Sequence, residues 1–85
     1  MSNLENEFQK KTEEVKSLTE MSNNNKLFLY KYYKQATIGN NNTEKPGFFD
    51  FVGREKWNAW ESVKGVSKDT AMHEYIIRAN ELLNE

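Results

Sequence analysis

The segment near the end of the chain has apolar residues at the spacing of an α-helix. They are Met72, Tyr75, Ile76, Ala79, Leu82 and Leu83. These positions share one face of a helix, and no segment shows the strict alternation of a half-buried β-strand. The chain has 85 residues and no cysteine, so an apolar core must hold it together without disulfides. We therefore expect an all-α protein with one domain, residues 1–85.

Turn-forming residues divide the chain into four helical segments. We predict helices over residues 4–18, 24–38 and 52–63, and a fourth that runs from Ser67, its N-cap, to Leu83. Ser22 or Asn23 is the expected N-cap of the second helix. Gly39 and Gly65 are expected to end the second and third helices. The connection between residues 39 and 49 is long for so small a domain and is either functional or a simple crossover.

Charge is distributed unevenly along the chain. The net charge is −1, but residues 30–68 carry seven basic and four acidic side chains, a balance of +3. Residues 1–29 carry a net charge of −1, and residues 69–85 carry −3. A local anionic ligand fits this distribution better than a polyanion such as nucleic acid, whose partners usually have a basic domain.

Tyrosines and lysines are concentrated between residues 30 and 34. On a helix, Tyr30, Tyr33 and Lys34 share one face, which suits a ligand with a stackable ring and phosphates. Lys56, on the next predicted helix, offers a second ammonium for a phosphate. Taken alone, each lysine is better explained as a solvated surface charge, and each tyrosine fits a core position equally well. Trp57 is most simply a core residue, as is Trp60.

Catalytic signatures are missing from the sequence. His73 is the only histidine, there is no cysteine, and no metal-ligand spacing or glycine-rich phosphate loop is present. His73 is expected at the surface. We predict a binding protein without enzymatic activity, metal or cofactor. Single-stranded nucleic-acid binding through the tyrosine and lysine cluster is an alternative that the acidic overall balance disfavours.

Motifs from residue 33 onward carry a more specific signal. The stretch Tyr33-Lys34-Gln35-Ala36-Thr37-Ile38-Gly39 is followed by Lys56-Trp57-Asn58-Ala59-Trp60. Around them, in order, stand Pro46-Gly47, Asp50, Gly53-Arg54, Lys64-Gly65, Ser67, Ala71-Met72 and Tyr75-Ile76. In order and spacing the chain resembles the acyl-CoA-binding protein family from about Phe8 to the last helix.

The resemblance implies a four-helix bundle with up-down-down-up topology that binds medium- and long-chain acyl-CoA. It implies an intracellular carrier, buffer and pool former that meets acyl-CoA-using enzymes transiently and is a monomer. The residues expected to hold the ligand are Lys16, Tyr30, Lys31, Tyr32, Tyr33, Lys34, Lys56 and Tyr75. Those expected along the acyl-chain or pantetheine groove are Phe8, Thr12, Val15 and Leu27.

The chain departs from the family pattern at three places. Val52 stands where many relatives have lysine, and Lys26 stands where an apolar residue is common. The linker between residues 19 and 25 is shorter by about one residue and lacks the proline often found there. These differences bear on chain-length preference and not on CoA recognition.

Location is suggested only by what the sequence lacks. The polar first sixteen residues do not resemble a signal peptide, and no run is long enough to span a bilayer. We expect a cytoplasmic protein without an integral membrane segment. A secreted signalling peptide, as some relatives yield, is the alternative and requires unconventional export.

Overall fold

The computed structural model describes residues 3–84, and its first element is helix α1 (Asn3–Glu14). Phe8 is its buried residue, and Lys11 forms an ion pair with Glu14 at 3.1 Å. The helix tightens into the 3₁₀ turn η1 (Val15–Ser17), and the chain turns extended at Leu18. The predicted helix therefore has the expected end, but its last turn is 3₁₀ and not α.

Helix α2 (Asn23–Thr37) begins at a side-chain cap. The Ser22 hydroxyl accepts a hydrogen bond from the backbone N–H of Asn25 at 3.2 Å. This satisfies one of the free donors at the start of the helix. At the other end, Gly39 adopts a φ of +103°, a left-handed conformation that favours glycine and lets the chain leave the helix. Ser22, one of two expected caps, and the stop at Gly39 are confirmed.

Helix α3 (Phe51–Glu61) follows the long connection from residue 39 to residue 50. The Asp50 carboxylate accepts a hydrogen bond from the N–H of Gly53 at 2.9 Å and caps this helix. A negative side chain at a helix N-terminus also interacts favourably with the helix dipole. The α-helical part ends two residues before the predicted Val63, and the following turn closes at Gly65, whose φ is +91°.

Helix α4 (Lys68–Leu83) has the cap that the sequence predicts. The Ser67 hydroxyl accepts a hydrogen bond from the N–H of Thr70 at 3.1 Å, and Asp69 lies in the first turn. The predicted apolar face is the packed face, because Tyr75 and Ile76 are buried together with Ala71 and Ala79. His73 is exposed, as expected.

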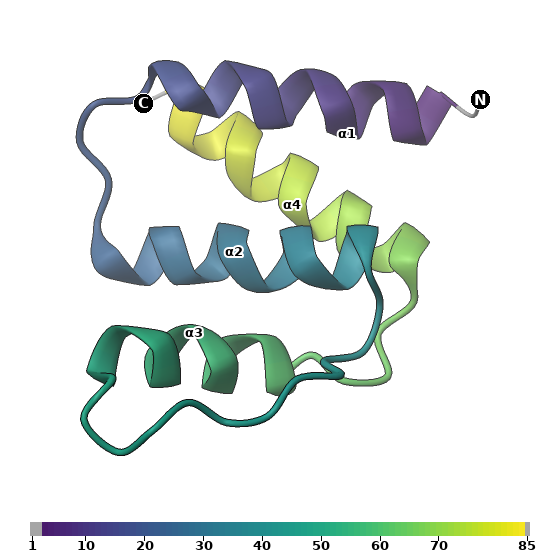
Figure 1. Cartoon of the computed structure of the whole chain (residues 1–85). Helices are drawn as coiled ribbons and strands as arrows, with labels where there is room; N and C mark the ends of the chain where they lie inside the picture. The colour runs from purple at the N-terminus through teal and green to yellow at the C-terminus, as the bar shows by residue number, and fades with distance from the viewer. Residues whose placement is uncertain (1–2, 85) are drawn as a thin grey trace.

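The four helices have the predicted up-down-down-up arrangement. In Figure 1, α1 and α4 run in one direction and α2 and α3 in the other. Helix α4 packs against both α1 and α2, and α3 packs against α2. Among the described residues, no Cα atom of α1 comes within 8 Å of a Cα atom of α2. The backbones of α1 and α2 therefore stay apart, while both helices pack against α4.

The core lies where α4 crosses α1 and α2. Its buried members are Phe8, Leu29, Ala36, Ala71, Tyr75, Ile76 and Ala79. The alanines allow helix backbones to approach closely, while Phe8 and Tyr75 contribute the largest apolar side chains of the core. Trp60 is buried as predicted. The same prediction is wrong for Trp57, which is only partly buried and donates to the carbonyl of Thr43 at 3.0 Å. An indole can pack at a surface when its N–H finds a partner there.

Candidate ligand-binding site

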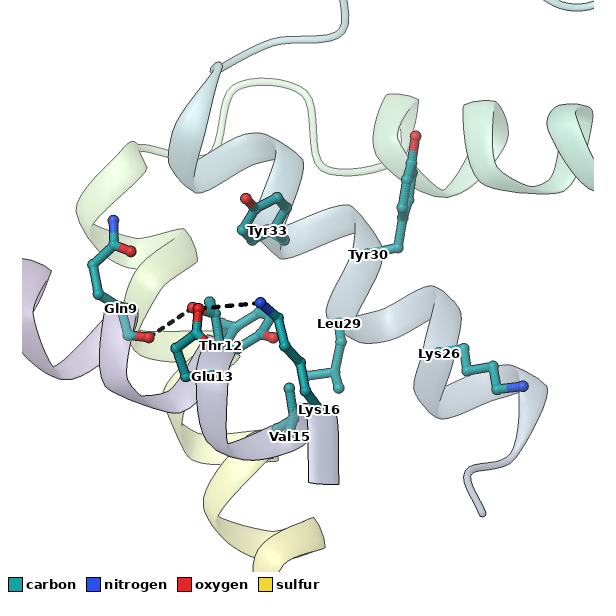
Figure 2. A pocket seen from close by; sticks show the side chains of 10 residues that line it. Gln9, Thr12, Glu13, Val15, Lys16, Lys26, Leu29, Tyr30 and Tyr33 are labelled. Atoms are coloured by element: carbon teal, nitrogen blue, oxygen red, sulfur yellow. Dashed lines mark hydrogen bonds and ion pairs between the residues drawn. The ribbon is translucent and has the colours of Figure 1, made fainter. Parts of the chain in front are cut away.

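A pocket of about 380 Å³ lies between α1 and α2, with Tyr75 of α4 among its lining residues. It occupies the region in which the two helix backbones stay apart. Figure 2 shows side chains of α1 and α2 facing one another across it. Its lining residues are Gln9, Thr12, Glu13, Val15, Lys16, Lys26, Leu29, Tyr30, Tyr33 and Tyr75. The pocket is thus polar on the α1 side and aromatic on the α2 side.

The α1 wall of the pocket carries an ion pair at the surface. Lys16 Nζ lies 3.1 Å from Glu13 Oε1, and both side chains are mostly exposed. Exposed pairs of this kind contribute little to stability, typically about 0–1 kcal/mol. Lys16 can therefore exchange Glu13 for a phosphate oxygen at small energetic cost.

The α2 wall has a tyrosine ring with two ammonium groups near it. Lys56 Nζ of α3 lies 5.5 Å from the centre of the Tyr30 ring, and Lys34 Nζ lies 6.0 Å from it. Neither lysine is in an ion pair with a carboxylate in the described part of the chain. The two charges converge on one ring from different helices, as the sequence suggested. Together they offer an aromatic face and rotatable donors for an anion.

Lys34 also lies over the ring of Trp60. Lys34 Nζ lies 5.0 Å from the centre of the Trp60 ring. The Trp60 indole N–H donates to the carbonyl of Gly39 at 2.8 Å and so joins α3 to the end of α2. The ammonium of Lys34 therefore lies over a buried ring.

A hydrogen-bond network ties the same end of α2 to the turn before α4. Gln35 is buried, and its Nε2 donates to Asn40 Oδ1 at 2.9 Å and to the carbonyl of Val66 at 2.8 Å. Asn40 Oδ1 also accepts from the N–H of Gly65 at 2.8 Å. Buried polar groups with partners of this kind favour a single arrangement of the backbone. The network thereby supports the helix turn that carries Tyr33 and Lys34.

Aromatic rings from three helices meet beneath the pocket. The ring centres of Phe8 and Tyr33 are 6.0 Å apart and stacked, and those of Phe8 and Tyr75 are 5.1 Å apart in an edge-on arrangement. Tyr33 and Tyr75 lie 6.4 Å apart. Tyr75 is buried while Tyr33 is exposed, so Tyr33 offers the accessible surface of this cluster.

Burial controls the ionisation of Tyr75. Loss of solvation raises the pKa of its phenol to about 12, with a smaller contribution from the neighbouring Tyr33. The neutral phenol is the form that persists at ordinary pH. Tyr75 can therefore present a hydroxyl, and not a repelling phenolate, to an anionic ligand.

Several of the predicted site residues line the pocket. They are Thr12, Val15, Lys16, Tyr30, Tyr33 and Tyr75. Lys34 and Lys56 do not line the pocket themselves, but their ammonium groups lie near the ring of Tyr30, which does. Phe8 lies beneath the wall, since only 1% of its surface is exposed. Leu27, partly buried on α2, is not among the lining residues.

Lys31 and Tyr32 belong to a different cluster on α2. Lys31 Nζ lies 5.1 Å from the ring centre of Phe28 and 5.4 Å from that of Tyr32. Arg78 of α4 covers the Phe28 ring at 4.0 Å. Glu74 of α4 and burial both raise the pKa of Tyr32, burial more strongly. The structure thus associates these residues with α4 and does not bring them to the pocket.

Three lining residues were not singled out from the sequence: Gln9, Glu13 and Leu29. Gln9 lies three residues before Thr12, Glu13 lies three residues before Lys16, and the two pairs are four residues apart, so one face of α1 and the following η1 turn contains all four. That spacing could have identified them. Lys26, noted as a departure from the family pattern, also lines the pocket, where it points away from Lys16 (Figure 2).

The described residues contain neither a metal site nor a membrane-spanning helix. Across residues 3–84 there is no group of three or more histidine, cysteine or carboxylate side chains placed to hold a metal ion. No helix in this range is long and apolar enough to cross a membrane. The arrangement of aromatic rings, ammonium groups and a groove defines a helical protein that binds an anionic ligand.

The comparisons with known proteins agree with this class. Residues 5–79 match the family described as acyl CoA binding protein. The chain is 48% identical over 83 residues to acyl-CoA-binding domain-containing protein 1 of Oryza sativa subsp. japonica, covering 96% of this chain and 91% of that one. It is 46% identical to the acyl-CoA-binding protein of Ricinus communis, again over 83 residues, covering 96% and 92%.

A solved structure has the same fold. The crystal structure of acyl-CoA-binding protein 2 of Oryza sativa superposes with a TM-score of 0.92 at 44% identity, covering 96% of this chain and 92% of that one. The chain belongs to the acyl-CoA-binding protein family. The fold class and the family predicted from the sequence are confirmed.

Proposed function

We propose that this protein binds medium- and long-chain acyl-CoA esters with high affinity and acts as a cytoplasmic carrier, buffer and pool former without catalysing a reaction. It delivers the ester to acyl-CoA-using enzymes through transient encounters and works as a monomer. The observation that carries the proposal is the Tyr30 ring, which lines the pocket and has Lys34 and Lys56 on it.

We assign the adenine and phosphate part of CoA to the α2 wall of the pocket and the adjoining Lys56 of α3. Tyr30 stacks the adenine ring, and stacking of a base on an aromatic side chain contributes about 1–3 kcal/mol in nucleic-acid sites. Lys34 and Lys56 pair with the ribose phosphate, since ammonium groups suit phosphate as rotatable donors. Lys16 of η1 approaches the remaining phosphates after leaving Glu13.

The tail of the ligand is assigned to the groove between α1 and α2. Val15 and Leu29 supply apolar surface there, and Thr12 and Tyr33 offer hydroxyls for the thioester and pantetheine arm. Each acyl methylene removed from water adds up to about 0.8 kcal/mol, so affinity rises with chain length until the groove is filled. A long-chain ester therefore binds much more tightly than free CoA.

Calorimetric titration with palmitoyl-CoA, octanoyl-CoA and free CoA tests the proposal. We expect affinity to fall in that order, with a negative heat-capacity change that grows with chain length. Equal affinity for palmitoyl-CoA and free CoA, or weak binding of all three, would sink the proposal. A shift assay with a single-stranded oligonucleotide tests the alternative, and we expect no complex.

A further inference from the structure

An exposed apolar surface lies at the turn into α3, and none of its residues lines the pocket. It consists of Phe48, Phe49, Phe51 and Val52, called here the phenylalanine patch. Their exposed fractions are 71%, 83%, 67% and 64%. The rings of Phe48 and Phe49 contact one another edge-on at 5.2 Å. Phenylalanine is usually buried, and a contiguous exposed group of this kind marks an interaction surface.

The patch is not needed to hold α3 in place. Trp60 attaches α3 to the end of α2 through its hydrogen bond to Gly39, and Asp50 caps the helix through Gly53. Helix α3 makes no close backbone contact with α1 or α4 in the described structure. Figure 1 shows the turn before α3 at a corner of the molecule, where a flat surface can reach it.

One basic side chain lies against the phenylalanine patch, and two more are close to it in sequence. The Arg54 guanidinium lies 5.6 Å from the centre of the Phe48 ring, and Lys45 Nζ lies 5.6 Å from that of Trp57. Lys45, Arg54 and Lys56 all lack an ion-pair partner within 4.0 Å in the described residues. The segment from residue 30 to residue 68 carries a net charge of +3, although Asp50 lies between Phe49 and Phe51 and two more carboxylates, Glu44 and Glu55, lie close in sequence to the patch.

Rings without polar groups beside unpaired cations are complementary to an anionic bilayer surface. Aromatic side chains enter the boundary between headgroups and acyl chains, while lysine and arginine meet the negative surface potential. A fluid bilayer accepts protruding rings without the shape-complementary pocket that a protein partner must provide.

We propose that the phenylalanine patch docks this protein on anionic bilayers, with the rings inserted and Lys45, Arg54 and Lys56 near the lipid phosphates. Lys56 lies 5.5 Å from the ring centre of Tyr30, which lines the pocket. The docked face therefore adjoins the pocket wall. The proposal goes beyond acyl-CoA binding and does not depend on it.

Flotation of the ligand-free protein with large unilamellar vesicles tests the proposal. Vesicles of phosphatidylcholine alone are compared with vesicles that also contain phosphatidylserine. We expect binding to the anionic vesicles that weakens as salt is raised. The double variant Phe48→Ser with Phe49→Ser should bind about tenfold less, because each ring removed from the lipid loses the free energy of apolar burial.

Ile77→Ser is the matched control, because Ile77 is an exposed apolar residue of α4, outside the patch. We expect it to float like the unchanged protein. Octanoyl-CoA affinity of the double variant should be unchanged, which shows that its fold and pocket are intact. No binding of the unchanged protein to anionic vesicles, or equal loss in both variants, overturns the proposal. Sedimentation showing a dimer that the double variant abolishes also overturns it in favour of a second copy.

Discussion

Replacing Lys34 by alanine separates ligand binding from folding stability. In the free protein, Lys34 lies over the rings of Trp60 and Tyr30, at 5.0 and 6.0 Å from their centres. A cation–π contact at a partly exposed site contributes about 0.5–1 kcal/mol. The lysine is in no ion pair in the described residues. The free energy of unfolding should therefore fall by no more than about 1 kcal/mol.

The expected loss of binding is larger. A hydrogen bond to a charged group contributes about 1.5–3 kcal/mol. Removal of one ammonium from a phosphate should therefore weaken palmitoyl-CoA binding about tenfold to a hundredfold. Lys56→Ala should behave alike, because it approaches the same ring. The double variant should lose less than the sum if one phosphate bridges both lysines.

Calorimetry for affinity and urea denaturation for stability measure the two effects on the same samples. Lys64→Ala is the matched control, because Lys64 lies after α3 in a weak exposed pair with Glu61. Lys31→Ala tests the assignment of Lys31 to the cluster with Phe28. We expect both variants to retain affinity within about twofold. If Lys34→Ala lowers stability by several kcal/mol and leaves affinity unchanged, the lysine is structural and the reasoning is refuted.

Phe8→Ala should lower the free energy of unfolding by about 3–5 kcal/mol, as measured by urea denaturation, because a fully buried ring is lost beneath the pocket; a loss below about 1 kcal/mol contradicts its place in the core. Ser67→Ala should cost about 1 kcal/mol by the same measurement, because the N–H of Thr70 loses its cap, whereas Ser67→Asp should restore most of it. Tyr75→Phe concerns alkaline pH. The folded-state pKa of Tyr75 is raised to about 12, so its neutral form stabilises the fold below its unfolded pKa of about 10, and this contribution is lost as pH rises from 10 towards 12. The unchanged protein should lose stability relative to Tyr75→Phe across that window in thermal melts, and parallel curves would refute the assignment.

Much of the fold follows from local patterns in the sequence. Ser22 and Ser67 are serines placed just before helical periodicity, and Gly39 follows its end, so side-chain capping and left-handed φ act over a few residues. The pairing of Tyr30 with Lys34 also follows from helix geometry, because four residues make about one turn. These features need no knowledge of distant parts of the chain.

Other features depend on tertiary packing that local spacing does not define. Lys31 is adjacent to Tyr30 in sequence, yet it lies with Phe28 and Tyr32. The rings of Phe28 and Tyr32 contact each other, and Arg78 of α4 covers the Phe28 ring. The sequence assigns Trp57 and Trp60 the same expected place in the core. The path of the connection before α3 brings the carbonyl of Thr43 to the Trp57 indole, and local spacing does not predict that path. Which face of α2 or α3 meets which neighbour is fixed by contacts across the bundle.

The separation between the α1 and α2 backbones has a consequence for measured stability. These two neighbouring helices meet at the stacked rings of Phe8 and Tyr33 but otherwise lack part of a helix interface, and a bound acyl chain would supply the missing apolar surface. The ligand would then act as a part of the core that is added after folding. At a free ligand concentration of one hundred times Kd, the gain in stability is about 2.7 kcal/mol. The melting temperature of a sample would therefore report how much of the protein carries its ligand.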